Sequence, residues 1–87
     1  MINVHLAEAE LLIVCINNIR RLPKSSAKRA IKQMALSTYP DVRNVQKHFR
    51  KSVYQWVYFD KPIDYNKLIG LAVAVRDKVA QESVPKN

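Results

Sequence analysis

A single glycine, Gly70, occurs among the 87 residues of the chain. Tight β-hairpin turns rely on Asn-Gly, Asp-Gly or Gly-Gly pairs, because these turns need positive φ angles that glycine adopts without strain. None of the three pairs is present. The hydrophobic fraction of 48% is sufficient for a packed core and argues against disorder. The sequence therefore predicts an all-α fold, a small bundle of about four helices in one domain spanning residues 1–87.

Helix-starting and helix-breaking residues divide the chain into these helices. Pro23 cannot continue a helix, whereas Pro40 suits a first-turn position. Ser25 or Ser26 and Asp64 are of the residue types that cap a helix start. The expected helices are Val4–Leu22, a second one from the serine caps to about Leu36, a third from Pro40 through Trp56, and a fourth over about Tyr65–Gln81. Residues 82–87 are expected to form a loose tail.

Two stretches are also compatible with β-strands. Leu11–Ile16 is a short, continuous apolar run, and residues 53–59 are rich in residue types that favour strands. The helical spacing of apolar residues extends beyond the first run and through Trp56 in the second. We therefore expect helix in both, and the strand alternative stays open for residues 53–59.

Positive charge is concentrated in one third of the chain. The chain has 15 Lys and Arg against 7 Asp and Glu, for a net charge of +8. Residues 20–51 hold ten of the basic residues but only one acid, Asp41. A local excess of this kind suits a polyanionic partner: nucleic acid first, then an acidic protein surface or an anionic membrane.

The third expected helix carries this charge on one side. Helical spacing places its apolar residues together, namely Val42, Val45, Phe49, Val53 and Trp56. Tyrosines interleave with the basic residues on the opposite side, and aromatic rings beside Lys and Arg suit unstacked bases. We therefore favour RNA or single strands over duplex DNA. The candidate nucleic-acid-binding residues are Lys28, Arg29, Lys32, Arg43, Lys47, Arg50, Lys51 and Tyr54, with Tyr58 extending the row.

Catalytic or metal chemistry is not indicated. His5 and Glu8 have helical ligand spacing, but zinc sites usually need a third protein ligand. Cys15 cannot form an intramolecular disulfide, and its apolar surroundings are expected to raise its thiol pKa. One glycine leaves no Gly-rich phosphate loop. We expect a protein that is not an enzyme and that has no metal and no cofactor.

Membrane insertion is not expected either. The longest strongly apolar run, Leu11–Ile16, is far shorter than the roughly 20 residues that span a bilayer. Helices one and four have apolar residues on two sides, and Gly70 and Ala74 share a face that could allow close helix contact. We expect a cytoplasmic protein that forms a homodimer through these surplus apolar faces.

Two functions fit these features. The first is a small, basic, non-catalytic protein that binds RNA or single strands with low sequence specificity, because phosphate contacts carry no sequence information. The alternative is an inhibitor or antitoxin-like factor of the phage or plasmid type. Its basic face would block a host nuclease, toxin or other nucleic-acid-handling enzyme.

Overall fold

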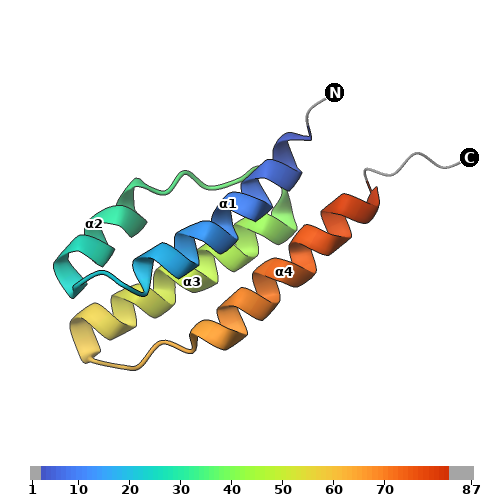
Figure 1. Ribbon diagram of the computed structural model, residues 1–87. Coiled ribbons are helices and arrows are strands. Elements are labelled where there is room, and N and C mark those ends of the chain that lie inside the picture. The colour runs from blue at the N-terminus through green and yellow to red at the C-terminus, as the bar shows by residue number, and fades with distance from the viewer. Residues whose placement is uncertain (1–2, 83–87) are drawn as a thin grey trace, which may run out of the picture.

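The computed structural model describes residues 3–82 as four helices. They are α1 (Val4–Ile19), α2 (Lys24–Gln33), α3 (Pro40–Phe59) and α4 (Tyr65–Glu82). Figure 1 shows α1, α3 and α4 as long rods running alongside one another, with the shorter α2 at one end. α1 packs chiefly against α4, and α2 packs against α3. The expected all-α class is confirmed, since no strand occurs within residues 3–82, and the stretch 53–59 is helical.

Capping groups set the beginnings of the helices. The Asn3 side chain accepts a hydrogen bond from the backbone N–H of Leu6 at 3.1 Å, which caps α1. Asp64 caps α4 as expected, because its Oδ1 accepts from the backbone N–H of Lys67 at 3.1 Å. α2 differs from the expectation: it begins at Lys24, with Pro23 in the N-cap position and no side-chain cap. The serine caps predicted for α2 are therefore wrong.

The helix ends also depart from the predicted limits. α1 ends at Ile19, before Leu22, and the backbone N–H of Leu22 bonds the carbonyl of Ile19 in a tighter turn. α2 ends at Gln33 instead of near Leu36. α4 includes Glu82, which the sequence assigned to the tail. The rest of that predicted tail, residues 83–87, lies outside the described residues.

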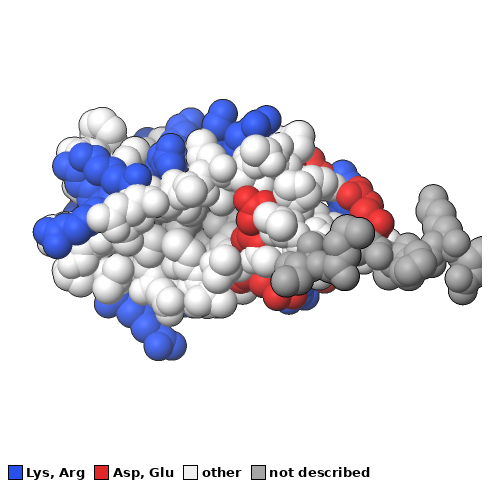
Figure 2. Space-filling model, turned by 90° about the horizontal axis from the view of Figure 1, so that it is seen from above, with Lys and Arg blue, Asp and Glu red and all other residues white. Residues whose placement is uncertain are grey.

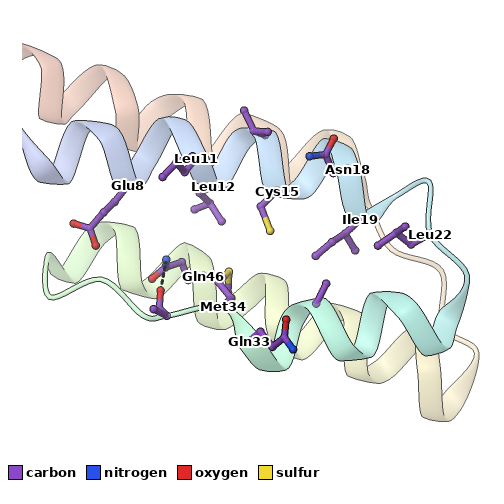
Figure 3. Close-up of a pocket in the computed structure, with 13 residues that line it drawn as sticks. Glu8, Leu11, Leu12, Cys15, Asn18, Ile19, Leu22, Gln33, Met34 and Gln46 are labelled. Carbon is purple, nitrogen blue, oxygen red and sulfur yellow. Dashed lines mark hydrogen bonds between the residues drawn. The ribbon is translucent and has the colours of Figure 1, made fainter.

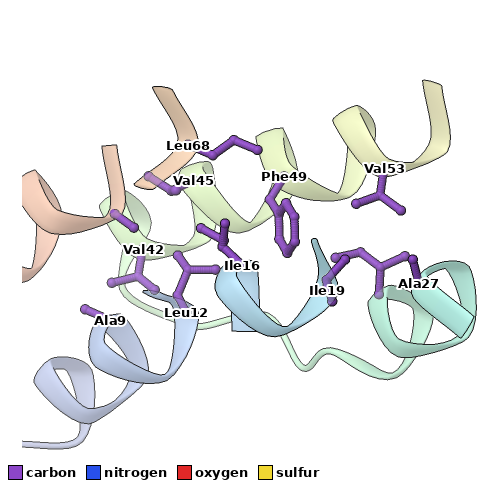
Figure 4. Packing of buried hydrophobic residues seen from close by; sticks show 12 residues of the cluster. Ala9, Leu12, Ile16, Ile19, Ala27, Val42, Val45, Phe49, Val53 and Leu68 are labelled. Carbon is purple, nitrogen blue, oxygen red and sulfur yellow. The ribbon is translucent and has the colours of Figure 1, made fainter. Parts of the chain in front are cut away.

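All four helices contribute to one apolar core. Phe49 is fully buried and points from α3 into the cluster, beside Ile16 and Ile19 of α1 (Figure 4). The buried cluster consists of Ala9, Leu12, Ile16, Ile19, Ala27, Ile31, Val42, Val45, Phe49, Val53, Leu68 and Ala72. The apolar side of α3 thus faces the core along the helix, which leaves its basic side toward solvent and α2.

Gly70 makes no close helix contact within residues 3–82. It is exposed on α4, and a Cβ added there would meet no atom within 4 Å. The chain therefore makes no close helix contact at Gly70 within residues 3–82, and the close contact expected from Gly70 and Ala74 stays a prediction. The extensive α1–α4 packing is made instead by the buried side of α4, where Leu68 and Ala72 lie.

Candidate nucleic-acid interface

The basic residues predicted to bind nucleic acid lie on two helices that pack against each other, α2 and α3. We call these basic residues, together with the two tyrosines that lie among them, the basic face. Its residues are Lys28, Arg29 and Lys32 of α2, and Arg43, Lys47, Arg50, Lys51, Tyr54 and Tyr58 of α3. Lys47 and Lys51 are exposed on α3, and Arg29 and Lys32 are exposed on α2. Within residues 3–82, Arg29, Lys32 and Arg43 form no hydrogen bond, ion pair or ring contact with the other residues of the face.

A shallow hollow of about 390 Å³ lies on the α3 part of this face. Its lining residues are Lys47, Arg50, Lys51, Tyr54, Gln55 and Phe59. Three cationic side chains and two aromatic rings therefore surround one open depression. Phe59 is 73% exposed, although it is a large apolar ring. Sequence reasoning missed Phe59, which a helical projection places four residues after Gln55 and eight after Lys51, on the solvent side.

Lys28 links the two helices through a tyrosine. Its Nζ lies 4.8 Å from the centre of the Tyr58 ring, a cation–π arrangement. The Tyr58 ring in turn lies 6.2 Å from the Tyr54 ring at an interplanar angle of 51°. A lysine of α2 and two tyrosines of α3 thus form one continuous group. The tyrosine interleaving predicted from the sequence places rings directly among the cations.

The basic face carries uncompensated positive charge. None of its Lys and Arg residues forms an ion pair with any residue in the range 3–82. Two of the acids pair with lysines outside this face: Asp60 with Lys24 and Asp41 with Lys78, both at 2.5 Å. Figure 2 shows the Lys and Arg side chains gathered mainly at one end and along one edge, with Asp and Glu nearer the opposite end. Such a surface attracts polyanions.

Arg50 differs from the other cations of the face. Its Nη2 donates to the carbonyl of Met34, at the end of α2, at 3.1 Å. Its Nε is buried and has no hydrogen-bond partner within residues 3–82. A cation at a helix C-terminus also interacts favourably with the helix dipole. Arg50 therefore holds α3 to the end of α2, in addition to lining the hollow.

The remaining sequence candidates lie away from this face. His5 Nδ1 lies 2.9 Å from Glu8 Oε1, and the His5 ring packs at 5.1 Å from that of Tyr39. The Tyr39 hydroxyl donates to Glu82, which raises the pKa of Tyr39. Cys15 is half-buried, and burial raises the pKa of its thiol. Within residues 3–82, no three His, Cys, Asp or Glu side chains cluster as a metal site would require.

None of the helices over residues 3–82 combines the length and the apolar character that a membrane crossing requires. Comparison of the chain with protein-family models, with curated proteins and with solved structures finds no match.

Proposed function

We propose that this protein is a non-catalytic RNA-binding protein that takes single-stranded RNA on the basic face. The observation that carries the proposal is the group of Lys and Arg side chains without ion pairs around the exposed Phe59 ring and the half-buried Tyr54 ring. Lys47 and Lys51 flank the hollow, and Tyr54 and Phe59 line it. Phosphates would lie against the lysines, and unstacked bases would lie on the rings.

Low sequence specificity follows from this chemistry. Lysine ammonium groups contact phosphates, which are the same at every position of a strand. Aromatic stacking is tolerant of base identity, because every base has a π face. Duplex DNA offers no free base faces, so the exposed ring of Phe59 and the half-buried ring of Tyr54 beside it favour single strands. We also propose that the protein acts in the cytoplasm as a homodimer.

Salt titration of RNA binding tests the proposal. Each phosphate contact on a single strand contributes about 0.7 to the slope of log K against log salt. The double variant Lys47→Ala, Lys51→Ala should bind a fluorescent uridine oligomer of about 16 nucleotides more weakly. Its slope should be smaller by about 1.4, because two phosphate contacts are lost. Fluorescence anisotropy at several salt concentrations measures both quantities.

A charge-matched control separates this effect from net charge. Lys61 and Lys67 are also exposed, but they lie after α3 and on α4, outside the basic face. The variant Lys61→Ala, Lys67→Ala should keep the parental affinity and slope. If the parent binds RNA measurably and Lys47→Ala, Lys51→Ala keeps the parental affinity and salt slope, the basic face is only a solvated surface and the proposal fails.

A second candidate function rests on Phe59. A ring that is 73% exposed beside unpaired cations also fits a pocket on an acidic protein, since aromatic anchors dominate many protein interfaces. The protein would then be an inhibitor that occupies the nucleic-acid site of an enzyme. Purification with and without RNase distinguishes the two functions. Retained RNA supports the first, and a stoichiometric protein that survives RNase supports the second.

A further inference from the structure

The polar lining of the hollow on α3 consists mainly of hydrogen-bond donors. Lys47, Arg50 and Lys51 donate hydrogen bonds and cannot accept them. The Gln55 amide and the Tyr54 hydroxyl can do both. A base that enters this hollow therefore meets three side chains that only donate. The base edge that fits best is one that is rich in acceptors.

Arg50 occupies a different position from the two lysines of the hollow. Lys47 and Lys51 are exposed, so their ammonium groups are free to follow phosphates over the surface. Arg50 is half-buried, and its Nε is buried completely. Phosphates lie on the outside of a strand whose bases turn toward the protein, so the exposed lysines are the groups that meet them. Arg50 is then left beside the base.

The guanidinium of Arg50 is held in place. Its Nη2 donates to the Met34 carbonyl at 3.1 Å. Met34 is itself fixed by packing, because its side chain lies against the core and points into the apolar groove between α1 and α2 (Figure 3). An arginine anchored in this way loses less freedom on binding a ligand than a mobile lysine does.

Arg50 also keeps donors for a ligand. Both N–H groups of Nη1 and the second N–H group of Nη2 have no acceptor within residues 3–82. Because the guanidinium is planar, its two terminal nitrogens can together reach two neighbouring acceptors. Guanine has such a pair in O6 and N7, which arginine binds through two hydrogen bonds. Adenine places an amino group beside N7, and cytosine presents an amino group on the corresponding edge.

We propose that the hollow selects guanine at one position of a single-stranded RNA, and that Arg50 determines this preference. The base stacks on Phe59 and Tyr54, Arg50 donates to O6 and N7, and the lysines hold the flanking phosphates. This inference rests on the proposed RNA binding. It adds a preference at one nucleotide and leaves the remainder of the strand unread, in keeping with phosphate contacts that carry no sequence information.

Exchange of one base in the RNA tests the preference on the unaltered protein. The probes are oligomers of about eight nucleotides, all uridine except for one central purine. The oligomer with a central guanosine should bind about 5- to 100-fold more tightly than the one with a central adenosine, the range expected for one bidentate contact. Adenosine is the matched control because it has a purine ring for stacking. Equal affinities for the two oligomers overturn the proposal.

Two altered bases identify the edge that is read. 7-Deazaguanosine has a carbon in place of N7 and should lose most of the preference, because one of the two acceptors is gone. Inosine lacks only the N2 amino group and should bind as guanosine does, since it keeps O6 and N7. The reverse result, with the preference kept by 7-deazaguanosine and lost by inosine, would overturn the contact to O6 and N7.

Arg50→Lys tests the residue itself. Lysine keeps the positive charge but cannot hold two acceptors in one plane, so the guanosine and adenosine affinities should become nearly equal. Lys51→Ala should weaken both and keep their ratio. A guanosine preference that persists in Arg50→Lys, at a parental melting temperature, overturns the role of Arg50. If RNA binds and Lys47→Ala, Lys51→Ala reduces the salt slope, but guanosine gains nothing over adenosine, this inference alone fails and the proposed function stands.

Discussion

The side chain of Gln46 in α3 hydrogen-bonds the backbone of Ser37, whose N–H donates to Gln46 Oε1 at 2.7 Å. The same side chain donates from Nε2 to the carbonyl of Ala35 at 3.2 Å. Both Gln46 and Ser37 are buried. A buried backbone group without a hydrogen-bond partner is costly. The Gln46 side chain supplies such partners to two backbone groups of the connection between α2 and α3.

Replacement of Gln46 should therefore destabilise the fold. Gln46→Leu keeps the volume of the side chain but leaves the Ser37 N–H and the Ala35 carbonyl without their partner. We expect a loss of about 1–3 kcal/mol in the free energy of unfolding, measured by urea denaturation. Asn44→Leu alters an exposed polar residue of the same helix and should change stability far less. Equal stabilities of the two variants would show that the Gln46 hydrogen bonds contribute little.

Arg50→Ala should also destabilise the protein, whereas Lys51→Ala should not. Removal of the guanidinium leaves the Met34 carbonyl at the end of α2 without its donor. A hydrogen bond from a charged group contributes about 1.5–3 kcal/mol. Lys51→Ala, at an exposed position that makes no such bond, should melt like the parent. Thermal melting of both variants measures the difference, and a parental melting temperature for Arg50→Ala would contradict the structural role of Arg50.

The aromatic residues of the hollow should affect RNA binding in a different way from the lysines. Tyr54→Ala or Phe59→Ala should weaken single-strand binding by about 1–3 kcal/mol, the contribution of one stacked base. The slope against log salt should stay constant, because stacking releases no counterions. Tyr54→Phe keeps the ring and should bind as the parent does. A flattened salt slope in Tyr54→Ala would mean that the ring positions lysines instead of bases.

The Lys24–Asp60 pair should be visible in a titration. A hydrogen bond from Lys24, aided by its charge, lowers the pKa of the Asp60 carboxyl below its ordinary value. Because the folded state has the lower pKa, the pair stabilises the fold above the ordinary pKa, and this contribution disappears as the pH falls through the lowered value. Lys24→Ala should return the Asp60 pKa toward its ordinary value in an NMR titration. An unchanged pKa would show that the pair does not persist in solution.

Gly70→Ala should stabilise the protein. Gly70 lies inside α4 with open space around the position of a Cβ, so alanine introduces no clash. The gain should approach about 1 kcal/mol, because glycine is a poor helix former relative to alanine. Ala74→Gly, the reverse change at an exposed position of the same helix, should cost a similar amount. Chemical denaturation of both variants is the test, and a loss of stability in Gly70→Ala would indicate an unseen neighbour.

The helices were predictable because their signals are local. Pro23 and Pro40 mark boundaries by their restricted backbones, and Asp64 marks one by its capping carboxylate. The apolar spacing of α3 identified Val45 and Phe49 as core residues. The end of α2 was not predictable from local signals. The carbonyls of Met34 and Ala35, directly after its last residue, accept hydrogen bonds from the side chains of Arg50 and Gln46, which lie 16 and 11 residues further along the chain.

The candidate site was likewise predictable where it depends on one helix, and unpredictable where it depends on contacts between helices. Helical spacing was enough to place Lys47, Lys51 and Tyr54 on one surface, since all belong to α3. The structural role of Arg50 depends on where α2 ends, and a single helical projection cannot show this. Tyr39 begins the same stretch, yet its hydroxyl bonds Glu82 of α4, at a position that only the packing of the helices determines.

The unequal distribution of charge has a consequence for kinetics. Glu8, Asp41 and Glu82 lie toward the end at which α1 begins and α4 finishes, whereas α2 and α3 carry unpaired cations (Figures 1 and 2). The molecule therefore has a permanent electric dipole. In the field of a polyanion it turns its basic face forward before contact, which raises the rate of productive encounters.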